Sequence, residues 1–151
     1  MMRRKFIGWG IACLLALGLG IGLALAEQAS EAGEHVKVLS AVEIVEALDG
    51  QKAKATTVEV TLRPSQSGQA HRHPGPGFVY ALEGEYELGI DDQPTRRFNA
   101  GETFYEPTGC LHRVSRNPSP TTNTRLIAVV LHPQDTEEIV LPAEMVDRHS
   151  K

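Results

Sequence analysis

Cysteine and basic residues are both in short supply in this chain. Only two of its 151 residues are cysteines, and only Cys110 lies outside the apolar N-terminal run. A single cysteine cannot form an internal disulfide, so the folded part must gain its rigidity in another way. The 15 Lys and Arg residues are outnumbered by 19 Asp and Glu, which gives a net charge of −4. An acidic chain repels nucleic acid and anionic lipid, so no nucleic-acid partner is expected.

The N-terminal segment has the organisation of an export signal. A basic cluster at residues 3–5 precedes an apolar, Gly-rich run from 6 to 25 that ends in Ala24-Leu25-Ala26. Signal peptidase accepts small residues at these positions, so residues 1–26 are predicted to be a signal peptide that is cleaved after Ala26. The protein is therefore expected to be periplasmic or secreted, with a mature part that starts at Glu27.

Two alternatives for this segment stay open. An apolar run of about 20 residues is just long enough to span a bilayer, so an uncleaved segment would be a membrane anchor and the chain's membrane contact. The pair Arg3-Arg4 resembles a twin-arginine export signal, but a basic region alone also fits the general secretory route. The sequence does not decide between the two routes.

The central part of the chain predicts a domain of short strands over residues 52–132. Residues 57–62 alternate polar and apolar side chains, which is typical of a half-buried strand. Gly and Pro separate the further predicted strands, which cover residues 71–73, 78–82, 85–90, 95–98, 103–106, 111–115 and 125–131. This pattern predicts an all-β sandwich or barrel. Its core is predicted to include Phe78, Leu82, Leu88, Phe98, Phe104, Leu111, Leu126, Ile127 and Val129.

The flanking segments are less sharply defined. Residues 27–51 are expected to form a linker and an N-terminal edge segment, in which residues 36–50 suit either a short helix or a strand. The helix reading rests on a capping box of Ser40 and Glu43. The C-terminal tail, residues 133–151, is expected to pack on the barrel through its apolar residues Ile139, Val140, Leu141 and Met145.

Two histidine-containing segments carry the chemistry. His71 and His73 are two residues apart on a predicted strand, so their side chains point to the same face and can chelate one ion. A second segment contains Gly101, Pro107 and Gly109 and then offers His112 as a third ligand from a neighbouring strand.

Together these segments resemble the paired motifs of the cupin superfamily. The second segment matches the pattern Gly-x5-Pro-x-Gly-x2-His at every spacing, and Gly84 matches the closing position of the first motif. The resemblance implies a single cupin (jelly-roll) β-barrel after the signal segment, with one metal ion held by His71, His73 and His112. Two positions depart from the pattern. Gly77 stands where many cupins have a carboxylate ligand, and Arg116, followed by Asn117, stands where an Asn is common.

A three-histidine site would leave a divalent ion with its full charge and with open coordination positions, which favours anionic ligands. The cofactor is expected to be one divalent transition metal ion. Iron(II) is the first choice by resemblance, and manganese, nickel, copper or zinc would also accept these ligands. The catalytic residues are unknown. Glu106 could face the barrel interior in place of the missing carboxylate or lie on the outer face, and Tyr80 could line the cavity or simply pack.

The resemblance implies two classes of function. The first is a metal-dependent oxidoreductase of the dioxygenase type that acts on a small anionic or enolisable molecule. The second is a non-enzymatic periplasmic protein that binds a metal or small ligand, so whether the protein is an enzyme stays open. A homodimer is also expected, because an edge strand near residues 36–48 would invite pairing of two barrels.

Overall fold

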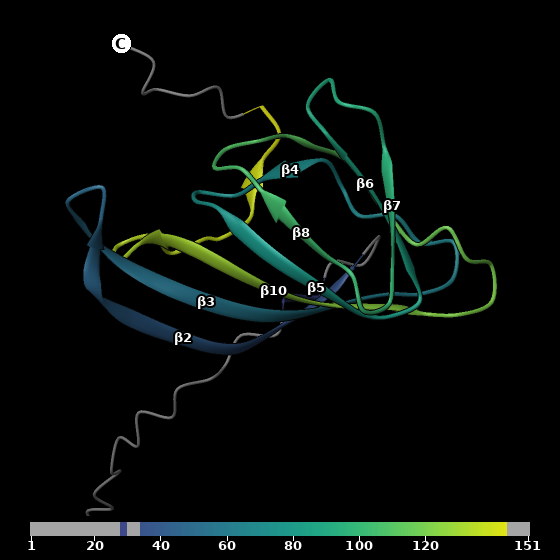
Figure 1. Cartoon of the computed structure of the whole chain (residues 1–151), viewed down its shortest axis with the longest axis horizontal. Helices are drawn as coiled ribbons and strands as arrows, with labels where there is room; N and C mark the ends of the chain where they lie inside the picture. Colours follow the sequence, from purple (N-terminus) through teal and green to yellow (C-terminus); the bar gives the residue numbers. More distant parts are fainter. Residues whose placement is uncertain (1–27, 30–33, 145–151) are drawn as a thin grey trace, which may run out of the picture.

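The computed structural model describes residues 28–29 and 34–144, and these form two antiparallel sheets. The predicted signal peptide and Met145 lie outside the described residues. The larger sheet has the strand order β1 (Gln28–Ala29), β2 (His35–Leu48), β3 (Gln51–Leu62), β10 (Thr124–Pro133), β5 (Gly77–Glu83) and β8 (Thr103–Glu106) (Figure 1). The described residues contain no helix that is long and apolar enough to cross a membrane.

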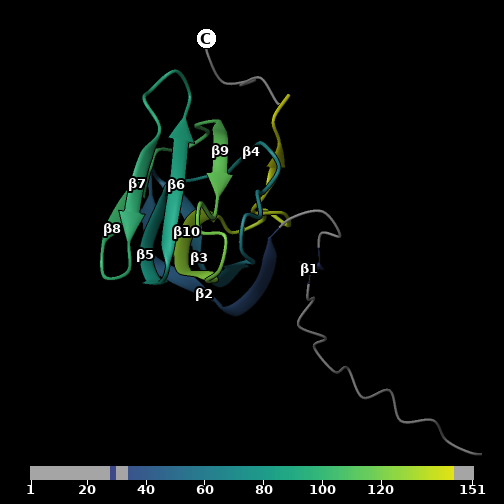
Figure 2. The same cartoon turned by 90° about the vertical axis from the view of Figure 1, so that its right-hand side faces the viewer.

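The smaller sheet carries most of the predicted site. Its order is β11 (Leu141–Pro142), β4 (His71–Arg72), β9 (His112–Arg116), β6 (Glu85–Ile90) and β7 (Arg96–Asn99). Figure 2 shows β7, β6, β9 and β4 in this order from left to right. The two sheets enclose a core in which Phe104 stacks on Phe98 and Tyr86, with ring centroids 4.3 and 5.6 Å apart. The all-β fold with a cupin-type barrel is therefore confirmed.

Residues 36–50, for which the sequence left a helix and a strand open, form a strand. β2 pairs with β3 along most of its length, and Asp49 and Gly50 turn the chain between them with positive φ angles. The capping box of Ser40 and Glu43 does not start a helix, because the pairing with β3 satisfies the backbone along the strand. Val36 and Val38 also pack against the core.

The buried and exposed faces of strand β5 are the reverse of those predicted from the sequence. Gly77, Val79 and Ala81 point inward, whereas Phe78 and Leu82 are 52% and 40% exposed. The prediction that Phe78 and Leu82 belong to the core is therefore wrong. Alternation shows that a strand has two faces but not which one is inside, and here the small side chains face the interior. Phe78 instead contacts Tyr105 on the outer surface, with ring centroids 5.4 Å apart.

A β-bulge in β9 reverses the alternation of that strand. Ile90 pairs with His112 while Gly89 pairs with Val114, so β9 contains one extra residue at this point. The bulge turns Ser115 and Asn117 inward after His112. Asn117 is 1% exposed and donates hydrogen bonds to the carbonyls of Leu62, Arg63 and Thr122. The one-residue offset of this Asn from the sequence motif therefore has a structural origin.

Candidate metal centre

The pairing of β4 with β9 brings the three predicted ligands together. His71 and His112 are direct cross-strand partners, and His73 follows β4 by one residue. The three rings have centroids 4.6 to 5.0 Å apart. One nitrogen of each ring lies within 4.8 Å of the other two, so the cluster could hold a metal ion. This one strand pair thus brings together two motifs that lie far apart in the sequence.

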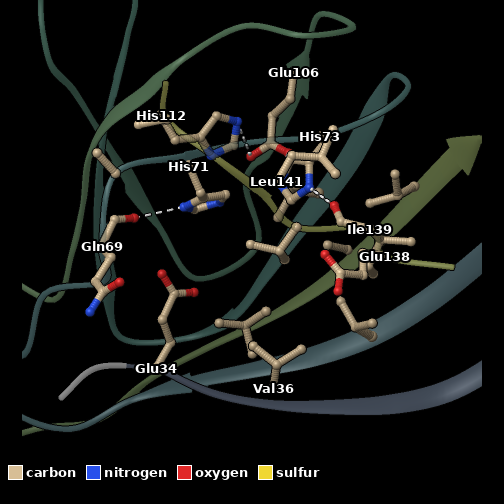
Figure 3. A pocket seen from close by; sticks show the side chains of 18 of the residues that line it. Glu34, Val36, Gln69, His71, His73, Glu106, His112, Glu138, Ile139 and Leu141 are labelled. Carbon is tan, nitrogen blue, oxygen red and sulfur yellow. Dashed lines mark hydrogen bonds and ion pairs between the residues drawn. The ribbon is translucent and has the colours of Figure 1, made fainter. Parts of the chain in front are cut away.

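Backbone carbonyls orient two of the rings. Nδ1 of His71 lies 2.8 Å from the carbonyl of Gln69, and Nδ1 of His73 lies 2.6 Å from the carbonyl of Ile139 (Figure 3). A carbonyl oxygen can only accept, so each Nδ1 must carry the proton and donate it. The Nε2 atom of both rings then keeps its lone pair, which is the tautomer a metal-binding histidine needs.

Burial keeps two of the histidines neutral. It is the main cause that lowers the pKa of His73 to about 4 and the pKa of His112 to about 2. Neighbouring imidazoles lower both values further, because a second positive charge would be repelled. Both rings are therefore unprotonated at neutral pH and free to donate their lone pairs.

His112 provides the most direct sign that this cluster fits a metal ion. Its side chain is 2% exposed, and its Nε2 atom is buried without a hydrogen-bond partner among the described residues. A buried polar atom without a partner is costly, and native structures rarely tolerate one without a reason. A bound cation would satisfy this lone pair together with those of His71 and His73, so the residues present fit the group.

Glu106 occupies the place that the sequence motif assigns to position 77. Gly77 and Glu106 are direct partners between β5 and β8, and a Cβ atom at position 77 would collide with the Glu106 carboxylate. Its two oxygens each lie 3.8 Å from an imidazole nitrogen, one of His73 and one of His112. Glu106 is 4% exposed, and burial, followed by the negative charge of Glu34, raises its pKa to about 8. The carboxylate therefore points into the barrel from the opposite strand.

The cluster opens into a cavity of about 720 Å³ between the sheets (Figure 3). Its walls are mostly apolar and are formed by Val36, Val58, Val60, Val79, Leu126, Ala128, Val130, Ile139, Val140 and Leu141. The histidines and Glu106 lie at one end, and Glu34 projects toward His71 from another side in Figure 3. An apolar cavity with a few converging polar groups is the usual form of a small-molecule site.

The structure places the candidate Tyr80 outside the cavity. Tyr80 lies on the outer face of β5, is 45% exposed and does not line the cavity. Tyr86 lines it instead, at 4% exposure. Cys110 is a free, buried cysteine whose pKa is raised to about 11, chiefly by burial and then by the charge of Glu106. A protonated thiol is a poor metal ligand.

Sequence reasoning missed the contribution of the C-terminal segment. Leu141 pairs with Arg72, and the Arg72 side chain donates to the carbonyls of Gly109 and Ala143. The carbonyl of Ile139 orients His73. The apolar residues of this segment indicated packing on the barrel, but a backbone carbonyl leaves no signal in the sequence.

Comparison with known proteins agrees with this architecture. The fold and the three-histidine cluster define a double-stranded β-helix protein with a candidate metal centre. Residues 58–130 match the sequence profile of the cupin domain, so the barrel belongs to the cupin superfamily. No curated protein is significantly similar to the sequence.

Similar solved structures support the fold only. A double-stranded β-helix protein from Klebsiella pneumoniae has a TM-score of 0.54 at 16% identity, covering 83% of this chain and 98% of that chain. An RmlC-like cupin from Shewanella frigidimarina has a TM-score of 0.53 at 17% identity, covering 77% and 91%. A variant of Bacillus subtilis oxalate decarboxylase has a TM-score of 0.57 at 15% identity, covering 78% and 30%. At these identities the likeness carries no activity over to this chain.

Proposed function

We propose that this protein is an exported mononuclear metal-binding cupin that acts as a metal-dependent oxidoreductase of the dioxygenase type. Its substrate would be a small anionic or enolisable molecule. The observation that supports this best is the convergence of three imidazoles at one end of a mainly apolar cavity, with the Nε2 atom of His112 buried and without a hydrogen-bond partner among the described residues.

The proposed ion is one divalent transition metal, with iron(II) as the first choice. When bound, it would supply positive charge and open positions at which a deprotonated ligand and O₂ can meet. His71, His73 and His112 would hold it. The carbonyls of Gln69 and Ile139 would keep the first two rings in the required tautomer.

Glu106 would supply the carboxylate that position 77 lacks. No described Lys or Arg forms an ion pair with it, its nearest ionisable neighbours, His73 and His112, are uncharged at neutral pH, and the negative charge of Glu34 opposes its own. A buried carboxylate is costly without a compensating charge, and a cation between these residues would provide one. Glu106 could then also accept a proton from an enolisable substrate.

The remainder of the cavity would hold the body of the substrate. The valines of β2 and β3, together with those of β5 and β10, make an apolar wall that limits water at the site. Exclusion of water protects reactive species from hydrolysis and strengthens electrostatic contacts. The protein's own contribution would be this apolar, shaped space.

Oxygen consumption tests the proposed activity. Protein loaded with iron(II) would be offered a panel of diketones, thiols and flavonols, and we expect uptake of O₂ with at least one of them. His112→Ala protein treated in the same way is the control and should be silent. If the parent is silent with iron, manganese, nickel and copper alike, the protein is a binder and the proposed oxidoreductase activity is wrong.

Export is tested separately. Mass analysis of the protein from an envelope fraction should give a mature N-terminus at Glu27. A full-length chain that stays in the membrane would show that residues 6–26 are an anchor.

A further inference from the structure

The cavity wall carries negative charge and has no opposing cationic side chain. Of the residues that line it, Glu34, Glu106, Glu138 and Glu144 are acidic, and no described Lys or Arg is among them. Glu138 and Glu144 are exposed at the rim, whereas Glu34 is half-buried. A preformed dianion would therefore meet repulsion from every charged side chain of the wall, with attraction only at the metal end.

Glu34 is held in place by a chain of hydrogen bonds. The hydroxyl of Ser115 donates to the Glu34 carboxylate over 2.9 Å, and the hydroxyl of Tyr86 donates to Ser115 over 2.9 Å. Tyr86 and Ser115 are each 4% exposed. The β9 bulge is the reason that Ser115 faces inward and can make this contact. Two buried hydroxyls from neighbouring strands thus fix one carboxylate at the cavity wall.

The local sequence also leaves room for this carboxylate. A Cβ atom at position 68 would collide with the Glu34 carboxylate as it is placed here, so a larger residue would require this side chain to move. Gly68 is tied to β9 through its amide, which donates to the carbonyl of Ser115 over 2.8 Å. Glu34 therefore sits in a prepared space and is not a loose surface side chain.

Glu34 and Glu106 face the same space from different sides. After burial, the negative charge of Glu34 is the next cause that raises the pKa of Glu106. Figure 3 shows Glu106 beside His73 and His112 and Glu34 projecting from the other side, next to Val36. Glu34 and Glu106 thus approach the histidine cluster from two different sides of the cavity, Glu34 from the side of His71.

We propose that Glu34 recognises a cationic, hydrogen-bond-donating group of the ligand on the side of the cavity away from Glu106. The ligand class is then a mainly apolar molecule with a weakly acidic oxygen head for the metal and a protonated amine at its other end. This inference rests on the proposed metal site and narrows its substrate class. It disfavours small dianions such as oxalate.

Three catechol probes with the same metal-binding head test the inference by calorimetry. They carry an aminoethyl, an ethyl or a carboxyethyl tail, and the full chain is loaded with redox-inert zinc and kept anaerobic. The readout is the ratio of affinities for the amine and the carboxylate probes, because this ratio does not depend on metal occupancy. In the parent the amine probe should bind most tightly and the carboxylate probe least tightly.

The variant Glu34→Gln removes the charge and keeps the shape. It should lower the affinity ratio by about tenfold, as expected for loss of a charge-assisted hydrogen bond, and leave the ethyl probe unchanged. Glu43→Gln, an equal charge change on the exposed part of β2, is the matched control and should leave the ratio unaltered.

Two results would overturn the inference and differ in what else they affect. If the catechols bind but the ratio is the same in Glu34→Gln as in the parent, Glu34 only anchors the chain to Ser115 and the proposed metal site survives. If no catechol binds to zinc-loaded parent, the metal site and the role of Glu34 both fail.

Discussion

Moving the Glu106 carboxylate to the neighbouring strand should show whether the metal site needs a carboxylate in this space or needs Glu106 itself. Gly77 and Glu106 are cross-strand partners, and the Glu106 carboxylate fills the space of a side chain at position 77. Gly77→Glu therefore places two carboxylates in one space, and Glu106→Ala empties it. The double variant Gly77→Glu/Glu106→Ala moves a single carboxylate from β8 to β5.

The structure sets the size of each effect. Gly77→Glu should destabilise the fold by about 1–3 kcal/mol through overpacking, and more because a second carboxyl group is buried beside the first. Glu106→Ala should fold normally and bind metal about 10–100-fold more weakly, as is typical when a group that supports a metal site is removed. The double variant should recover most of the affinity, so the two substitutions should be strongly non-additive.

Competition with a chelator at fixed pH measures the affinities, and thermal unfolding of each protein without metal measures the stabilities. The reasoning is refuted if the double variant binds metal no better than Glu106→Ala, since position 77 would then not be equivalent to position 106. It is also refuted if Gly77→Glu is as stable as the parent, because the predicted collision would not exist.

Two further predictions concern assembly and Tyr86. The protein should be a dimer by light scattering, because β1 pairs only with His35 and Val36 of β2 and leaves the rest of this strand, with exposed Leu39, Val42 and Val45, along the edge of the sheet. Val45→Lys should shift the protein to monomer, and a monomeric parent at micromolar concentration would reject this prediction. Burial raises the pKa of Tyr86 well above its ordinary value of 10, so its contribution to stability is present below pH 10 and is lost above it. Tyr86→Phe should therefore leave the phenolate absorbance of the folded protein near pH 10 unchanged, and a clear drop in that absorbance would contradict the burial argument. Loss of the hydrogen bond to Ser115 should lower the free energy of unfolding in urea by about 1 kcal/mol.

The spacing of the sequence motifs was sufficient to find the three histidines. His71 and His73 share a strand, and the turn residues Gly101, Pro107 and Gly109 bring His112 into register beside them. These features are local, so a single sequence contains them. The short strands were predictable for the same reason, because alternation and Gly or Pro turns are visible without any tertiary contact.

The features that were not predicted from the sequence depend on how the strands pair in the folded protein. The inward face of β5 was predicted wrongly, because the small residues of this strand face the interior. Phe78 and Leu82 face outward, and Tyr80 lies on the same outer face. The sequence could not decide whether Glu106 faces the interior, because this depends on its pairing with Gly77. Glu34 lies in a polar segment with no motif, and the bulge that turns Ser115 toward it has no marker in the residue pattern.

The central claim is that one metal ion is held by the three-histidine cluster, and metal stoichiometry tests it most directly. Elemental analysis of the protein purified from its native envelope should find about one transition metal ion per chain. His112→Ala should lose it almost entirely. His132→Ala removes an equally buried histidine that is bonded to Thr56 outside the cavity, and it should retain the metal. Retention of a full equivalent by His112→Ala, with affinity equal to that of the parent, would contradict the account.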